Sequence, residues 1–212
     1  MDLLHGLDLL STFVFALVGA RVAADKGLDY GGIAFIAAIA SVSGGTLRNV
    51  FLGLKPIWIT DPSIIASVIL AVLITLVFRR VTHIGKTLLV MDTFGLAIAT
   101  ISGTQLAFEQ DISWYGAILL GLVTAVTGGL LRDVLCQLEP VLLHRETIGT
   151  SSLMGAITFV ALVELNVSNS VSAILAGSVV VLTRVLSIRF DLHLPKFSSK
   201  SRDNYFIFEK SL

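Results

Sequence analysis

Seven apolar segments, each of roughly 20 residues, follow one another along the chain and restrict its fold more than any other feature. A segment of this length crosses the ~30 Å hydrocarbon core of a bilayer as a helix, which satisfies its own backbone hydrogen bonds. The segments cover residues 3–24, 30–53, 62–81, 87–107, 113–136, 147–165 and 170–188. The sequence therefore predicts an all-α membrane protein with seven transmembrane helices.

The composition agrees with a membrane protein and excludes several functions. Hydrophobic residues make up 55% of the 212 residues and charged residues only 14%, which is too little charge to cover a soluble domain. The formal net charge is zero, so the composition favours no nucleic acid or acidic partner. Cys136 is the single cysteine, and no Cys/His cluster, nucleophile–base pair or phosphate-binding loop is recognisable. We therefore expect no enzymatic activity and no cofactor.

An internal repeat divides the chain. The sequence SGGTLRNV at residues 43–50 recurs as TGGLLRDV at residues 127–134, an offset of 84 residues (128 − 44). The same offset, without a gap, superposes Asp8 on Asp92 and Pro56 on Pro140. We therefore predict two three-helix repeats at residues 3–81 and 87–165, a seventh helix at 170–189 and a tail at 190–212. Three crossings per repeat invert the second repeat relative to the first, an arrangement that places functional sites near mid-membrane.

The distribution of lysine and arginine predicts the orientation. With seven helices, one side of the membrane has only Lys55 and the other has eleven basic residues. Those eleven are Arg21, Lys26, Arg79, Arg80, Lys86, Arg145, Arg189, Lys196, Lys200, Arg202 and Lys210. We therefore expect an N-terminus outside and a cytoplasmic C-terminus. The remaining arginines lie within helices, and Arg184 is expected to extend toward the cytoplasmic surface.

Each repeat has a glycine pair in its second helix, Gly44-Gly45 and Gly128-Gly129. Adjacent glycines are common sites of helix bending, so we predict a break at both pairs. A break would free backbone carbonyls about one turn earlier, and free carbonyls in a wet path can bind a dehydrating cation. The carbonyls concerned are those of Ala40, Ser41, Thr124 and Ala125. The alternative is that the small residues only let helices pack closely.

An arginine follows each glycine pair by about one turn, at a depth where an unpaired charge is unfavourable. Because helix two ends on the side where helix one begins, Arg48 is expected to pair with Asp8. By inversion, Arg132 is expected to pair with Asp92. Asp133 is adjacent to Arg132 and should point in another direction on a helix, toward a water-filled path. The alternative is that both ion pairs only fix helix packing.

Two Gly-Gly-x-x-Arg-[Asp/Asn] motifs in a seven-helix frame resemble the prokaryotic TRIC family of trimeric intracellular cation channels, whose repeat is also described as a glycine transporter domain. The similarity covers about residues 3 to 189. It implies a homotrimer with a pore in each subunit, lined by bent second and fifth helices and permeable to monovalent cations, chiefly potassium. The implied pore and gate positions are Gly44, Gly45, Arg48, Asn49, Gly128, Gly129, Arg132 and Asp133. Asn49 departs from the acidic residue of the fuller motif, and the Lys-Glu-Val segment for a phosphoinositide is absent.

Our main hypothesis is passive conduction of potassium and sodium in the inner (plasma) membrane, where lipid is the other partner. The carbonyls, together with Ser43, Thr127 and Asp133, would replace part of the hydration shell. The rival is a secondary transporter of a small solute such as glycine, because carriers also use inverted repeats. A structural assembly without transport would explain the ion pairs but not the glycine pairs.

Overall fold

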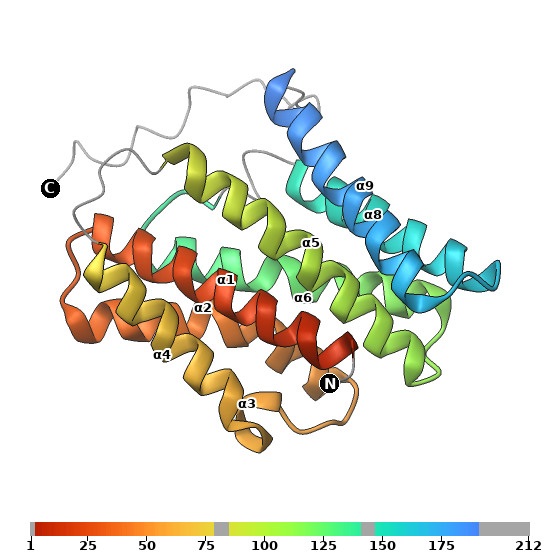
Figure 1. The fold of residues 1–212 in the computed structure, drawn as a ribbon, viewed down its shortest axis with the longest axis horizontal. Helices are drawn as coiled ribbons and strands as arrows, with labels where there is room; N and C mark the ends of the chain where they lie inside the picture. Colours follow the sequence, from red (N-terminus) through yellow and green to blue (C-terminus); the bar gives the residue numbers. More distant parts are fainter. Residues whose placement is uncertain (1–2, 79–84, 141–146, 191–212) are drawn as a thin grey trace, which may run out of the picture.

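The computed structural model describes residues 3–78, 85–140 and 147–190, and every regular element in these ranges is a helix (Figure 1). The helices are α1 (Leu3–Asp25), α2 (Tyr30–Phe51), α3 (Ile57–Thr60), α4 (Pro62–Val77), α5 (Gly85–Glu109), α6 (Trp114–Leu135), α8 (Thr147–Glu164) and α9 (Asn169–Arg189). Six of them, α1, α2, α5, α6, α8 and α9, are long and apolar enough to cross a membrane. The chain is thus an all-helical, multi-pass membrane protein.

The third expected span is shorter than predicted. The sequence predicted a helix over residues 62–81, but α4 has 16 residues and its C-cap is Phe78. At ~1.5 Å per residue such a helix is about 24 Å long, less than the ~30 Å hydrocarbon core. Six described helices therefore reach spanning length, and a seven-span topology stays a prediction. Residues 79–81 and nearly all of the predicted tail, 191–212, lie outside the described residues.

Local sequence signals set several helix ends. Asp29 caps α2, since its Oδ1 accepts a hydrogen bond from the Gly32 amide at 2.7 Å. Asp61 caps α4 in the same way through the Ser63 amide at 2.8 Å, with a proline in the first turn of the helix. Gly27 follows α1 in the left-handed region with φ of 75°, where a side chain would be strained. The chain therefore turns sharply between the first two long helices.

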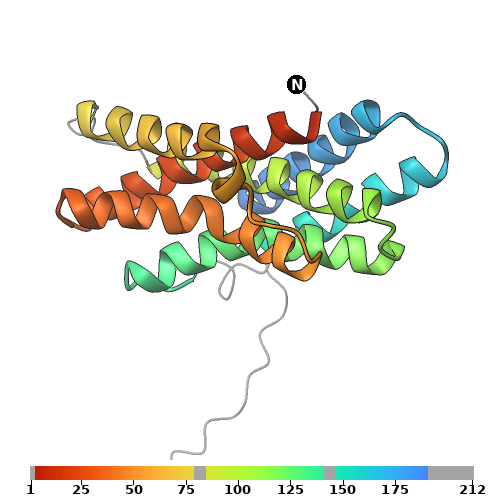
Figure 2. The same cartoon turned by 90° about the horizontal axis from the view of Figure 1, so that it is seen from below.

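The helices pack in a pattern that repeats along the chain. In the first half α1 packs against α2 and α4, and in the second half α5 packs correspondingly against α6 and α8. Across the halves α1 lies against α5 and α2 against α6, while α9 packs on α5 and α8 (Figure 2). The helices that carry the two glycine pairs are thereby brought into direct contact.

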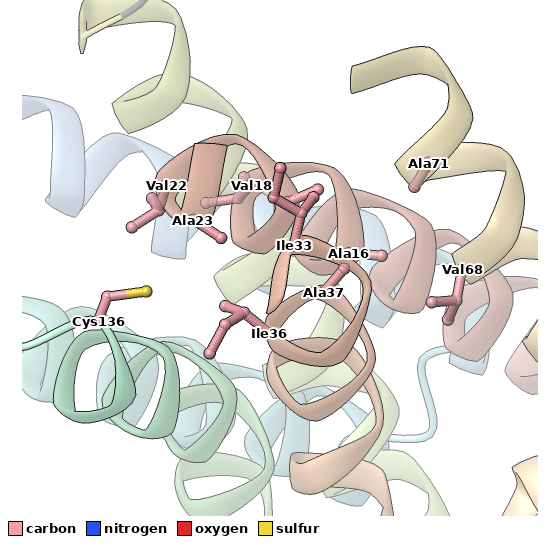
Figure 3. Packing of buried hydrophobic residues seen from close by; sticks show 11 residues of the cluster. Ala16, Val18, Val22, Ala23, Ile33, Ile36, Ala37, Val68, Ala71 and Cys136 are labelled. Atoms are coloured by element: carbon pink, nitrogen blue, oxygen red, sulfur yellow. The ribbon is translucent and has the colours of Figure 1, made fainter. Parts of the chain in front are cut away.

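Small and aliphatic side chains hold α1 and α2 together (Figure 3). Ala16, Ala20 and Ala37 are fully buried there, and Ile36 fills the space toward Cys136, which caps the end of α6. Alanine-rich faces allow close approach of helix backbones, which is how helices associate where burial from water gives little driving force.

Candidate functional site

Arg48 is the centre of a buried polar cluster between α1, α2 and α5, which we call the Arg48 cluster (Asp8, Arg48, Asn49 and Ser102). Its side chain is 0% exposed, and its two terminal nitrogens donate to the two carboxylate oxygens of Asp8, both at 2.9 Å. Nε donates to Oδ1 of Asn49 at 2.9 Å. A bidentate arginine–carboxylate pair is the geometry in which a buried charge is best compensated.

Ser102 of α5 completes this cluster and was not anticipated from the sequence. Its hydroxyl accepts from Nη1 of Arg48 at 2.7 Å and donates to Oδ1 of Asp8. The repeat offset places Val18 at the corresponding position of the first repeat. The sequence has serine at position 102 and valine at the matching position 18. This difference was its only sign that the two clusters are not equivalent at this point.

The Arg132 cluster (Asp92, Arg132 and Asp133) is the second-repeat counterpart, formed by α5 and α6. Nη1 of Arg132 donates to Oδ1 of Asp92 at 2.7 Å, and Nε donates to Oδ1 of Asp133 at 2.9 Å. The side chain of Asp92 is 19% exposed, against 9% for Asp8. Because Asp133 stands where the first repeat has Asn49, the Arg132 cluster has one more carboxylate than arginine, whereas the Arg48 cluster is balanced.

The structure thus brings Arg48 to Asp8 and Arg132 to Asp92. The expectation that Asp133 points away from Arg132 is wrong, because the two side chains form an ion pair. The arginine stem is long enough for Nε to turn back to the adjacent residue, as Arg48 also does toward Asn49. Arg184 is likewise buried rather than surface-directed, and it donates to Thr147 Oγ1 at 2.8 Å.

The glycine pairs lie where α2 and α6 cross. A Cβ on Gly44 would overlap the backbone carbonyl oxygen of Thr124, and a Cβ on Gly128 would overlap that of Ala40. The second glycine of each pair has space, since a Cβ on Gly45 or Gly129 would meet only the end of an arginine side chain, at 4.0 and 3.7 Å. The first glycine of each pair therefore permits the crossing.

Both helices are continuous through their glycines, α2 from Tyr30 to Phe51 and α6 from Trp114 to Leu135. The predicted breaks are therefore wrong for this conformation. The physical reason is that an α-helix accepts glycine when a neighbouring backbone occupies the space that the side chain leaves. The close-packing alternative explains Gly44 and Gly128.

Two cavities lie beside α2 and α6 at this crossing. The Arg48 cavity has about 40 Å³ of space for water-sized molecules. The Arg132 cavity has about 20 Å³. Residues lining the Arg48 cavity include Asp8, Ala40, Ser41, Gly45, Arg48 and Thr124. Those lining the Arg132 cavity include Asp92, Ala125, Gly129, Arg132 and Asp133. Each charged cluster thus faces its own cavity.

Two hydroxyl side chains expected at the path lie near the crossing on α2 and α6. The Ser43 hydroxyl is buried and has no hydrogen-bond partner among the described residues. It lies 3.9 Å from where a Cβ on Gly128 would be. Thr127 Oγ1 donates to the Val123 carbonyl at 2.6 Å. Ser43 therefore has a hydroxyl without a hydrogen-bond partner among the described residues, close to Gly128.

Known proteins resemble the chain in sequence and in structure. The family model described as glycine transporter matches residues 5–80 and again residues 89–164. The UPF0126 inner membrane protein YadS of Escherichia coli (strain K12) is 30% identical over 200 residues, covering 92% of this chain and 97% of that protein. The UPF0126 membrane protein YvgT of Bacillus subtilis (strain 168) is 26% identical and covers 91% and 95%.

Solved structures of known proteins also resemble the chain. The TRIC trimeric intracellular cation channel orthologue from Rhodobacter sphaeroides superposes with a TM-score of 0.86 and 29% identity, covering 91% of this chain and all of that one. A TRIC cation channel whose structure was solved to explain conductance gives 0.82 and 29%, covering 94% and 100%. The two matches of the family model begin at residues 5 and 89, 84 residues apart, which is the offset of the repeat.

Proposed function

The chain belongs to the glycine transporter family of membrane proteins and shares its fold with TRIC cation channels, and from this premise we propose that it conducts monovalent cations, potassium and also sodium. The pore runs within one subunit, along α2 and α6, the second and fifth of the long helices. It joins the Arg48 cavity to the Arg132 cavity. The residues that form it are Ser43, Gly44, Gly45, Arg48, Asn49, Thr127, Gly128, Gly129, Arg132 and Asp133.

One observation carries this proposal: two cavities lie at the α2–α6 crossing, each beside a buried arginine–aspartate cluster. Buried charges inside a membrane protein are retained where they face an aqueous path or one another. The hydroxyl of Ser43 lies beside the crossing, and the carbonyls of Ala40, Ser41, Thr124 and Ala125 become available there in a conformation in which α2 and α6 open at their glycine pairs. Such oxygens can replace part of the hydration shell of a potassium ion as it passes.

The arginines do not oppose cations in this arrangement, because their charge is neutralised by Asp8 and Asp92. Asp133 places a second carboxylate beside the Arg132 cavity. A negative charge beside a narrow path attracts cations and repels anions. This supports cation over anion conduction.

The same comparisons support the wider arrangement. We place the protein in the inner membrane, as its E. coli relative is named, with two inverted three-helix repeats at residues 3–81 and 87–165, a seventh helix and a cytoplasmic tail. The N-terminus lies outside, in accordance with the eleven-to-one distribution of basic residues. The protein assembles as a homotrimer, because the R. sphaeroides relative is named a trimeric channel.

The family description names glycine, so the decisive experiment compares two activities of the purified protein in liposomes. We expect potassium flux and single-channel current steps, with no saturable uptake of labelled glycine. Glycine uptake without current would refute the channel and favour the carrier. Wild-type liposomes without either activity would leave neither function standing.

A further inference from the structure

Phe15 of α1 is the one residue that lines both the Arg48 cavity and the Arg132 cavity among those described. Phe15 therefore borders both cavities. Its side chain is only 5% exposed, and it belongs to a buried apolar cluster with Leu96, Ala99 and Ala125. Each of these three neighbours also lines one of the two cavities.

The phenyl ring is held by the helix opposite. A Cβ on Gly95 of α5 would come 3.2 Å from a carbon of the ring, so the ring rests against a position that has no side chain. The repeat offset pairs Phe15 with Ala99, which contributes only a methyl group to the Arg48 cavity. Only the first repeat therefore supplies an aromatic ring at this position, so a comparison of the two repeats does not point to Phe15.

We propose that Phe15 is the apolar gate of the pore, separating the Arg48 cavity from the Arg132 cavity in this conformation. A hydrophobic constriction excludes water and ions without filling the whole passage, and it opens when the apolar group moves aside or is removed. Movement of α1 relative to α5 carries the ring toward or away from Gly95 and so sets the conducting state. This inference rests on the proposed cation conduction and names the residue that limits it.

The first test is potassium flux from liposomes of phosphatidylcholine and phosphatidylglycerol. Phe15→Ala is expected to raise the flux about tenfold, equivalent to a barrier about 1.4 kcal/mol lower. Phe15→Ser should raise it at least as much, because a hydroxyl also favours wetting. Phe13→Ala is the matched control: Phe13 is a phenylalanine of the same helix that packs against the α1–α2 cluster and lines neither cavity. Wild-type flux in both Phe15 variants, with folded protein confirmed by gel filtration, would overturn the proposal, as would an equal rise in Phe13→Ala.

A second test does not depend on conduction. In a Cys136→Ser background, Gly45→Cys reports on the Arg48 cavity and Gly129→Cys on the Arg132 cavity, since a Cβ has space at both positions. A charged, membrane-impermeant thiol reagent is applied to right-side-out and to inside-out membrane vesicles. With Phe15 present, the cysteine at position 45 should react in one vesicle type only. The cysteine at position 129 should react only in the other type. Adding Phe15→Ala should make each react in both. Two-sided reaction with Phe15 present would refute the gate.

The flux test and the cysteine-access test distinguish the proposed gate from the proposed conduction. If no variant conducts potassium but cysteine access changes as described, the conduction proposal fails and the apolar barrier stands. If the wild-type protein conducts and neither flux nor access responds to Phe15, the gate fails and conduction stands.

Discussion

Gly44 of α2 lies directly against the backbone carbonyl oxygen of Thr124 in α6, and no side chain larger than hydrogen fits between them. Ala40 and Gly128 repeat this contact with the roles of the helices exchanged. Two reciprocal glycine–carbonyl contacts hold the helices at backbone distance, where weak Cα–H···O interactions can form. The crossing between the two cavities is therefore fixed by these two glycines.

This contact predicts different effects for the two glycines of one pair. Gly44→Ala should lower the free energy of unfolding by about 1–3 kcal/mol through overpacking, because the clash is with backbone. Gly45→Ala should be neutral or slightly stabilising, since the site has space and alanine is the better helix former by about 1 kcal/mol. Thermal unfolding in detergent measures both. Equal effects of the two substitutions would instead favour a hinge that needs both glycines.

The two aspartate partners should differ in their contribution to stability. Asp8→Asn removes the carboxylate of the fully buried Arg48 and should reduce stability by about 3–5 kcal/mol. Asp92→Asn should cost less, about 1–2 kcal/mol, because Arg132 keeps Asp133 and the site is more exposed. Parallel thermal unfolding of the two variants tests this order. An equal or larger loss for Asp92→Asn would contradict it.

The second carboxylate of the Arg132 cluster predicts an effect on conduction as well as on folding. Asp133→Asn keeps an oxygen that can accept from Nε of Arg132, as Asn49 does for Arg48. Removing one charge beside the path should raise the barrier for a cation by about 1 kcal/mol, or lower potassium flux about fivefold. Liposome flux measures this change, normalised to the amount of folded protein that gel filtration recovers. Undiminished flux would show that the charge of Asp133 does not act on the permeating cation.

Ser102 should stabilise its cluster through both of its hydrogen bonds. Ser102→Ala leaves Asp8 and Arg48 short of one partner each in a buried site, which should lower stability by about 1–3 kcal/mol. Ser11→Ala is the matched control, because that nearby hydroxyl donates only to the backbone carbonyl of Asp8 at 3.1 Å. If Ser11→Ala destabilises the protein as much as Ser102→Ala, the hydrogen bonds of Ser102 to Asp8 and Arg48 have no special role.

The fold class could be predicted from the sequence because each helix is specified locally. Apolar length, capping residues such as Asp29 and the glycine after α1 depend on neighbours within a few positions. The 84-residue repeat added long-range information, which led from Arg48 to Asp8 and by inversion from Arg132 to Asp92. The predicted end of α4, at residue 81, was too late, because the apolar run already ends at Phe78, before the basic pair Arg79-Arg80.

The sequence by itself determined the helices, the repeat and which charges had to find partners, because a buried charge in a membrane requires compensation whatever the packing. Only the tertiary structure decided that the glycine pairs permit a crossing rather than a break, that Asp133 turns to Arg132, that Ser102 joins the Arg48 cluster, and that Phe15 lines both cavities. These outcomes depend on contacts between helices distant in the chain. Such contacts are set by helix crossing and side-chain rotamers, which leave no local pattern in the sequence.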